Sequence, residues 1–155
     1  MLDEANGRLE SGEDIIIGYI ECHGRKETNY QIKNLEIIPR KQITYNGISL
    51  EEMDTEAIIK RNPESVLVDE LAHNNVPGSK YNKRYKENIQ RNKYFNIQHL
   101  ESLNDSIKHI TGIRVNETVP DLIIELADEV EVIDNCSHSY RIISCTHYYL
   151  YSHRS

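Results

Sequence analysis

The stretch DIIIGYIE (residues 14–21) decides the fold class of this chain. Its run of isoleucines is typical of a strand that is covered on both faces, as in a parallel sheet. The stretch SVLVD (residues 65–69) repeats this composition later in the chain. Between the two, Asp54 can cap a helix over residues 55–61. Strands that alternate with helices predict an α/β fold with a mainly parallel sheet flanked by helices.

Turn and capping residues predict the remaining elements. Asn46-Gly47 separates two short apolar runs and predicts a β-hairpin. Leucines and isoleucines at helical spacing predict a helix that starts at Asn96 and ends at Gly112. The other predicted elements are an opening helix over residues 2–9, a polar helix over 24–35, a short helix after Pro120 and a strand over 129–133. Together these elements predict a Rossmann-like arrangement of three layers.

Composition excludes several classes of protein. The formal net charge of -7 argues against nucleic acid as a partner, because binding to phosphates needs a basic surface. The longest apolar run, residues 15–17, is far shorter than a membrane span, and the first 13 residues contain no apolar stretch of the signal-peptide type. We therefore expect a cytoplasmic chain with no membrane span of its own.

The composition changes after Asp134. From there to the end no acidic residue occurs, and four of the ten tyrosines lie in this part. We expect an α/β domain of residues 1–134 and a divergent tail of residues 135–155 that is poorly integrated with it.

Cysteine and histidine residues in this tail form two C-x-H pairs, Cys136 with His138 and Cys145 with His147. Thiolate and imidazole are good zinc ligands, but one intervening residue is not the usual spacing of structural zinc sites. The chain's three cysteines form no C-x-x-C pair either. We predict neither a metal site nor a disulfide framework.

The acidic pair Asp69-Glu70 is the sharpest candidate for a chemical role. It ends an apolar strand, and the carboxyl ends of parallel strands line the ligand crevice of such sheets. Two carboxylates there suit a Mg-nucleotide site, where one holds a metal-bound water and the other orients an attacking water. The alternative is that the acids cap the next segment of the chain, and the sequence leaves both possibilities open.

The loop that follows is the second candidate. His73 begins it, and Lys80 is one of several basic residues that could approach an anionic ligand. Gly78-Ser79-Lys80 resembles part of a phosphate loop, but the earlier glycine and the immediate helix of G-x-x-x-x-G-K-[ST] are missing. The alternative is a solvated loop. His23 and Arg25, after the first strand, have the same two interpretations.

Several blocks of sequence carry a family resemblance. They are GYIECHGRKET (18–28), LEIIPRKQITYNGISLEEMD (35–54), VLVDELAHNNVPGSK (66–80), KRY (83–85), NIQHLESLNDSIKHITGIRVNETVPD (96–121) and ADEVEVID (127–134). In this order they resemble the N-terminal domain of the KdpD sensor histidine kinases, the osmosensitive potassium-channel sensor domain. The resemblance fades after Asp134.

The resemblance implies a P-loop NTPase-like fold and a regulatory role in the cytosol. The parent sensor kinase lies in the cell membrane and passes phosphate to a response regulator that controls potassium uptake. VLVDE is similar to the family's Walker B strand, which implies that Asp69 and Glu70 stand on the Mg-ATP side, with His73 and Lys80 as further candidates. The family's Walker A segment would precede Met1, so the fold is expected to be incomplete and ATP binding by this chain is doubtful. Residues 86–95 are expected to be too short and too polar for the helix and strand that the family has there.

Three hypotheses follow from the sequence. The leading one is a regulatory domain of a potassium-responsive two-component sensor, not catalytic by itself although its parent family is a phosphotransferase. The second is a Mg-ATP-binding domain with weak ATPase activity, and the third is a decayed fragment that folds poorly. Submillimolar binding of Mg-ATP that Asp69→Asn abolishes would favour the second.

Overall fold

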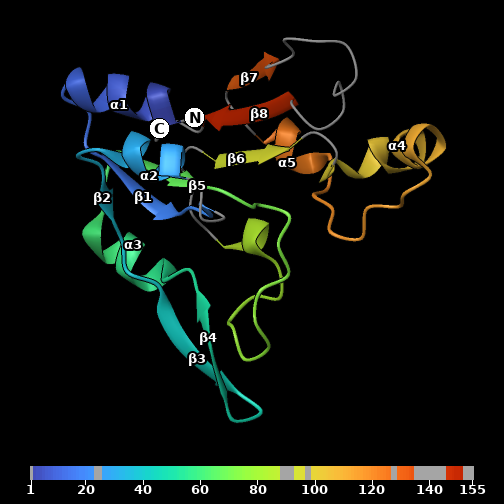
Figure 1. The fold of residues 1–155 in the computed structure, drawn as a ribbon, viewed down its shortest axis with the longest axis horizontal. Helices are drawn as coiled ribbons and strands as arrows, with labels where there is room; N and C mark the ends of the chain where they lie inside the picture. Colours follow the sequence, from blue (N-terminus) through green and yellow to red (C-terminus); the bar gives the residue numbers. More distant parts are fainter. Residues whose placement is uncertain are drawn as a thin grey trace.

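A small parallel sheet forms the first half of the fold, in a computed structural model that describes residues 2–22, 26–87, 93–96, 99–126, 129–134 and 146–151. Its strands lie in the order β2 (Glu36–Ile37), β1 (Ile15–Tyr19), β5 (Ser65–Val68), and β1 pairs in parallel with both neighbours. Every residue of β1 and β5 is buried. The two predicted strands are therefore confirmed, and they are covered on both faces (Figure 1).

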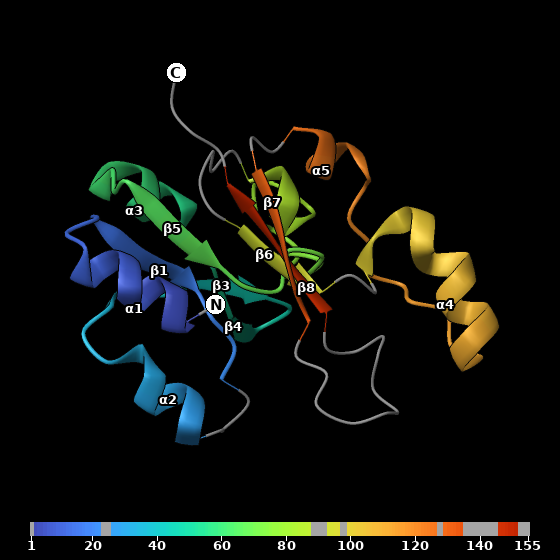
Figure 2. The ribbon, with the colours of Figure 1, turned by 90° about the horizontal axis from the view of Figure 1, so that it is seen from above.

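Helices cover both faces of this sheet. In Figure 2, α1 (Leu2–Glu10) and α2 (Lys26–Ile32) lie on one side and α3 (Thr55–Arg61) lies on the other. Alternate residues of β1 pack against the helices on the two sides of the sheet, because successive side chains of a strand point to opposite faces. Ile15 and Ile17 pack in the core below α1, whereas Ile16 packs in the core below α3. The predicted α/β class is confirmed.

The β-hairpin is also confirmed. It consists of β3 (Lys41–Tyr45) and β4 (Ile48–Glu52), which pair only with each other among the described strands and extend away from the parallel sheet (Figure 1). Asn46 and Gly47 both have positive φ, 50° and 78°, as a two-residue hairpin turn of type I′ requires. After the hairpin, Asp54 caps α3 by accepting a hydrogen bond from the Ala57 amide.

A second sheet departs from the prediction of a mainly parallel arrangement. It has the order β6 (Lys93–Asn96), β8 (Thr146–Tyr151), β7 (Glu129–Asp134), and both pairings are antiparallel. Strand β8 lies between the other two, so residues 146–151 of the tail are integrated with the fold, contrary to our expectation. The pattern of the sequence missed this because β6 and β8 are far apart in the chain. The division at residue 134 stays a prediction.

The helix expected from Asn96 starts later. Asn96 is the last residue of β6, and the helical segment begins as a 3-10 helix, Glu101–Leu103, that continues into α4 (Asn104–Thr111). Residues 86–95 were expected to be too short and too polar for both a helix and a strand, and a short strand does begin there, since Lys93 and its neighbours pair with β8. Gly112 ends α4 with φ 74°, as predicted.

Two short helical segments complete the described chain. A 3-10 helix, Arg84–Lys86, follows the loop after β5, and α5 (Leu122–Glu125) follows Pro120 as predicted. Leu71, Leu100 and Val119 form a smaller core beside the second sheet. Within the described ranges no helix is both long and apolar enough to cross a bilayer.

Candidate functional site

The carboxyl ends of β1 and β5 lie side by side because the two strands are parallel. Asp69 follows β5, and its backbone N–H donates to the Tyr19 carbonyl over 2.9 Å. Its carboxylate accepts one hydrogen bond from the Glu70 amide at 2.9 Å and one from the Glu21 amide at 3.4 Å. The Asp69 side chain therefore joins the two strand ends through backbone amides.

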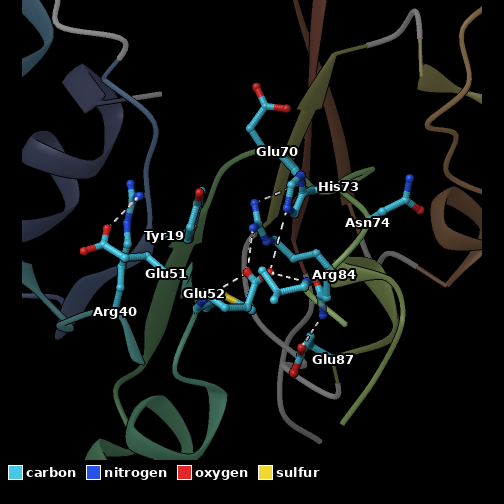
Figure 3. A network of polar contacts seen from close by, with 12 residues as sticks. Tyr19, Arg40, Glu51, Glu52, Glu70, His73, Asn74, Arg84 and Glu87 are labelled. Atoms are coloured by element: carbon cyan, nitrogen blue, oxygen red, sulfur yellow. Dashed lines mark hydrogen bonds and ion pairs between the residues drawn. The ribbon is translucent and has the colours of Figure 1, made fainter. Parts of the chain in front are cut away.

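Glu70 turns the chain sharply at the end of β5. Its φ of 53° is in the left-handed region, which is uncommon for a residue other than glycine. The turn directs Leu71 and Ala72, both buried, into the smaller core. In Figure 3 the Glu70 carboxylate points away from the buried polar cluster around Arg84. Glu70 contributes only its backbone carbonyl to that cluster, as an acceptor for Arg84.

Arg84 is the centre of this cluster and is 1% exposed. Its Nη2 atom donates to Glu52 Oε1 over 2.8 Å, and its Nη1 atom donates to the carbonyls of Asp69 and Glu70 at 3.3 and 3.2 Å. The guanidinium carbon lies 3.6 Å from the centre of the Tyr19 ring. A single side chain thus connects the end of β4, the ends of β1 and β5 and the 3-10 helix Arg84–Lys86.

Glu52, also 1% exposed, is the counter-ion of Arg84. Its carboxylate accepts hydrogen bonds from the backbone amides of Met53 at 2.9 Å and Val76 at 3.1 Å. Burial raises the pKa of this carboxyl, but the hydrogen bonds from Met53, Arg84 and Val76 outweigh burial and leave the pKa below its usual value. Glu52 is therefore ionised in the folded protein at neutral pH.

Acidification should weaken the fold through Glu52. Because the pKa is lowered on folding, the ionised carboxylate stabilises the protein above its usual pKa of 4.5, and this stabilisation is lost as the pH falls below that value. We expect the free energy of unfolding, measured by urea denaturation between about pH 5 and pH 3, to fall less steeply in Glu52→Gln than in the wild type. Glu51→Gln, at an exposed neighbour, is the control. Equal slopes in Glu52→Gln and wild type would contradict the assignment.

A second buried carboxylate lies next to the first. Glu87 accepts a hydrogen bond of 2.7 Å from Asn75 Nδ2 and a short one from the Thr55 hydroxyl. Asn75 Nδ2 also donates to the Tyr81 carbonyl at 3.1 Å. These contacts tie the loop after β5 to the first turn of α3.

Tyr19 lies between two guanidinium groups in Figure 3, Arg84 on one side and Arg40 on the other. The Arg40 guanidinium carbon is 4.4 Å from the ring centre. Arg40 is itself engaged, since its Nη2 atom donates to the Ile20 carbonyl over 2.7 Å and it pairs with Glu21 and Glu51. Burial is the main reason that the pKa of Tyr19 is raised, against the opposing effect of both arginines.

The structure brings three of the four predicted site residues together. Asp69 and Glu70 lie at the strand ends, and His73 lies beside them, with Nε2 3.8 Å from Glu52 Oε2 and Nδ1 3.9 Å from a Glu117 carboxylate oxygen. Lys80 is separate from this group.

The loop that carries Lys80 lies beside the β-hairpin. A Cβ atom built at Gly78 would be 3.6 Å from Ile43 Cγ2 of β3, and the Lys80 ammonium is 5.5 Å from the ring centre of its neighbour Tyr81. The next helical segment starts only at Arg84. Gly78-Ser79-Lys80 therefore has neither the strand before it nor the helix after it that a phosphate loop has.

The sequence did not indicate Glu52 as a site residue. It indicated Arg84 only as one member of a basic loop. One signal could have found Glu52: it follows Ile48 and Leu50 at every second position of β4, which places it on the same face of the hairpin. No sequence pattern marks Arg84 as a buried residue.

The arrangement acts as a structural connection more than as a reactive centre. Its arginines are bound to carboxylates and carbonyls of the same chain. Three or more possible metal-binding side chains do not gather anywhere in the described part of the chain. The two C-x-H pairs of the tail and the pair His23 and Arg25 lie outside the residues whose side chains are described.

A family model described as the osmosensitive K+ channel His kinase sensor domain matches residues 1–142. The chain belongs to this family. Sensor protein KdpD of Mycobacterium tuberculosis is 45% identical over 141 residues, and the proteins of that name from Escherichia coli and Clostridium acetobutylicum are 42% and 44% identical over the same length. Each match covers 86% of this chain and 16% of the relative. The chain thus spans about a sixth of these KdpD proteins, and the resemblance found in the sequence is confirmed.

Proposed function

We propose that this chain is a regulatory module of a potassium-responsive two-component sensor histidine kinase and that it transfers no phosphate by itself. The observation that carries the proposal is the match of a histidine kinase sensor-domain family over residues 1–142. The relatives are named sensor proteins, and the part that aligns is a small fraction of each. In this proposal the partners are the remaining domains of a membrane-bound sensor kinase and its response regulator, and the module works in the cytosol.

We also propose that the fold is a relative of the P-loop NTPases. A parallel sheet with helices on both faces and an acidic pair directly after a buried strand supports this relationship. Asp69 and Glu70 take the Walker B position in this proposal, with His73 and Lys80 as peripheral candidates. In this proposal residues 1–134 form the main part of the module, and residues 135–155 are its divergent end, which supplies strand β8.

The charged groups around Asp69 are engaged within the chain. The Asp69 carboxylate accepts hydrogen bonds from the backbone amides of Glu21 and Glu70, which hold it between the two strand ends. Arg84 is buried against Glu52, and the contact described for Lys80 is with the ring of its neighbour Tyr81. We infer that Asp69 has a structural role in this chain.

A chimeric kinase tests the regulatory role. The aligned segment of Escherichia coli KdpD would be replaced by the matching residues of this chain, and output would be measured with a reporter gene under the response regulator across a range of potassium concentrations. We expect deletion of the segment to shift the potassium concentration of half-maximal output at least about fivefold, the lower end of ordinary allosteric coupling. This chain should return the midpoint to within about twofold of the native kinase.

Two controls complete the experiment. Arg84→Met in the chimera should lose the effect, whereas Lys60→Met, an exposed change on α3, should keep it. A chimera that behaves like the deletion would contradict the regulatory role. Submillimolar Mg-ATP binding by the purified chain, abolished by Asp69→Asn, would contradict the inference about Asp69.

A further inference from the structure

A cavity of about 410 Å³ lies between α4 and the segment that returns from it. Figures 1 and 2 both place α4 at the side of the molecule, away from the parallel sheet and the Arg84 cluster. The proposed regulatory role does not involve this cavity. Its volume is within the range of sites that hold small molecules.

Two opposed walls line the cavity. Glu101, Asn104 and Asp105 form the helical wall, at spacing i, i+3, i+4, which places them on one face of the continuous helical segment. The opposite wall consists of Arg114, Val115, Asn116 and Thr118 of the returning segment. One wall is thus acidic, and the other carries a guanidinium, an amide and a hydroxyl.

Hydrogen bonds fix the walls at both ends. At one end the Asn104 side chain donates to the Val115 carbonyl at 3.0 Å and accepts from the Val115 amide at 3.1 Å. At the other end the Val119 amide donates to the His99 carbonyl at 2.7 Å, and the Glu101 amide donates to the Val119 carbonyl at 3.0 Å. A ligand would therefore find the cavity already formed, which reduces the entropic cost of binding.

The charges of the two walls form no ion pairs among the residues that the structure describes. None of the ion pairs between described side chains includes Arg114, Glu101 or Asp105, although all three line the same cavity. Opposite charges that face a common space without meeting suit a ligand that carries both signs. A ligand with a single charge would leave the other wall without a partner.

We propose that this cavity binds a small zwitterion that bears a carboxylate and an ammonium group. The Arg114 guanidinium binds the carboxylate as a planar donor, and Glu101 and Asp105 bind the ammonium. Asn116 and Thr118 supply further polar contacts to the ligand.

Titration of the purified full chain with L-alanine, L-glutamine and L-lysine tests the proposal. The readout is the shift of backbone amide NMR signals from residues 101–118. We expect saturable binding of at least one of the three, weaker by about tenfold or more in Arg114→Gln and in Asp105→Asn, because each removes a charged hydrogen-bond partner. Lys108→Gln and Glu125→Gln, exposed and outside the cavity, are the charge-matched controls and should bind within about twofold of wild type.

Acetate and ethylammonium serve as probes with one charge each. Both are expected to bind at least about tenfold more weakly than the zwitterion. The proposal is overturned if none of the three amino acids saturates the shifts, if a singly charged probe binds as tightly, or if the cavity variants match their controls. Unchanged NMR signals elsewhere in each variant show that it is folded. Since the assay uses no kinase, its result is independent of the chimera.

Discussion

Replacing Arg84 with methionine should lower the free energy of unfolding by about 3–5 kcal/mol, because the change leaves the Glu52 carboxylate buried without its counter-ion. It also removes the hydrogen bonds to the carbonyls of Asp69 and Glu70. Equilibrium unfolding in urea at neutral pH measures the loss. Lys60→Met, the same substitution at an exposed position of α3, should change the value by no more than about 0.5 kcal/mol.

The double variant Glu52→Gln, Arg84→Met separates the effect of the ion pair on stability from the effect of side-chain packing. Neutral glutamine does not leave a buried charge, so part of the lost stability should return relative to Arg84→Met alone. If Arg84→Met were no more harmful than Lys60→Met, the guanidinium would not connect the strand ends as described.

Gly18→Ala should lower the free energy of unfolding by about 1–3 kcal/mol through overpacking. A Cβ atom at this position of β1 would lie 2.7 Å from Val66 Cγ1 and 2.8 Å from Ile58 Cδ1, so that these buried side chains, or the elements that carry them, must shift. Pairing between β1 and β5 is already irregular at this residue. Urea unfolding again provides the measurement.

Gly7→Ala is the matched control, because nothing lies within 4 Å of the Cβ atom it would add. Gly7 lies inside α1, where alanine is the better helix former by about 1 kcal/mol, so this variant should be slightly more stable than the wild type. Opposite signs for the same substitution would show that the effect at Gly18 comes from contact. A neutral Gly18→Ala would mean that the sheet and α3 are less closely packed.

Local patterns predicted the first sheet and its helices well. The isoleucines of residues 14–21, the cap at Asp54 and the turn at Asn46-Gly47 each act within a few residues of the chain, and each was confirmed. The short polar segment before Asn96 gave no such local pattern, and its strand pairing depends on residues about fifty positions later in the sequence. Short sequence patterns cannot identify a pairing partner that lies so far along the chain.

The candidate site, too, was predictable from the sequence only in part. Asp69 and Glu70 lie at the carboxyl edge of the parallel sheet, as the rule for parallel strand ends predicts, and His73 follows them in the next turn of the chain. The roles of Glu52 and Arg84 come from burial, which is a property of the whole fold. A charged residue in a polar segment gives no sequence signal that it will be enclosed, since arginine is rarely buried.

Strand β8 has a consequence for how the protein is made. Among the described strands, β6 and β7 meet only through β8, which comes last in the chain. On the ribosome, the parallel sheet has all its strands once residue 68 has emerged, whereas the antiparallel sheet must wait for residues 146–151. A nascent chain therefore exposes two unpaired strand edges until residues 146–151 have emerged, and this interval is when a chaperone would be of most use.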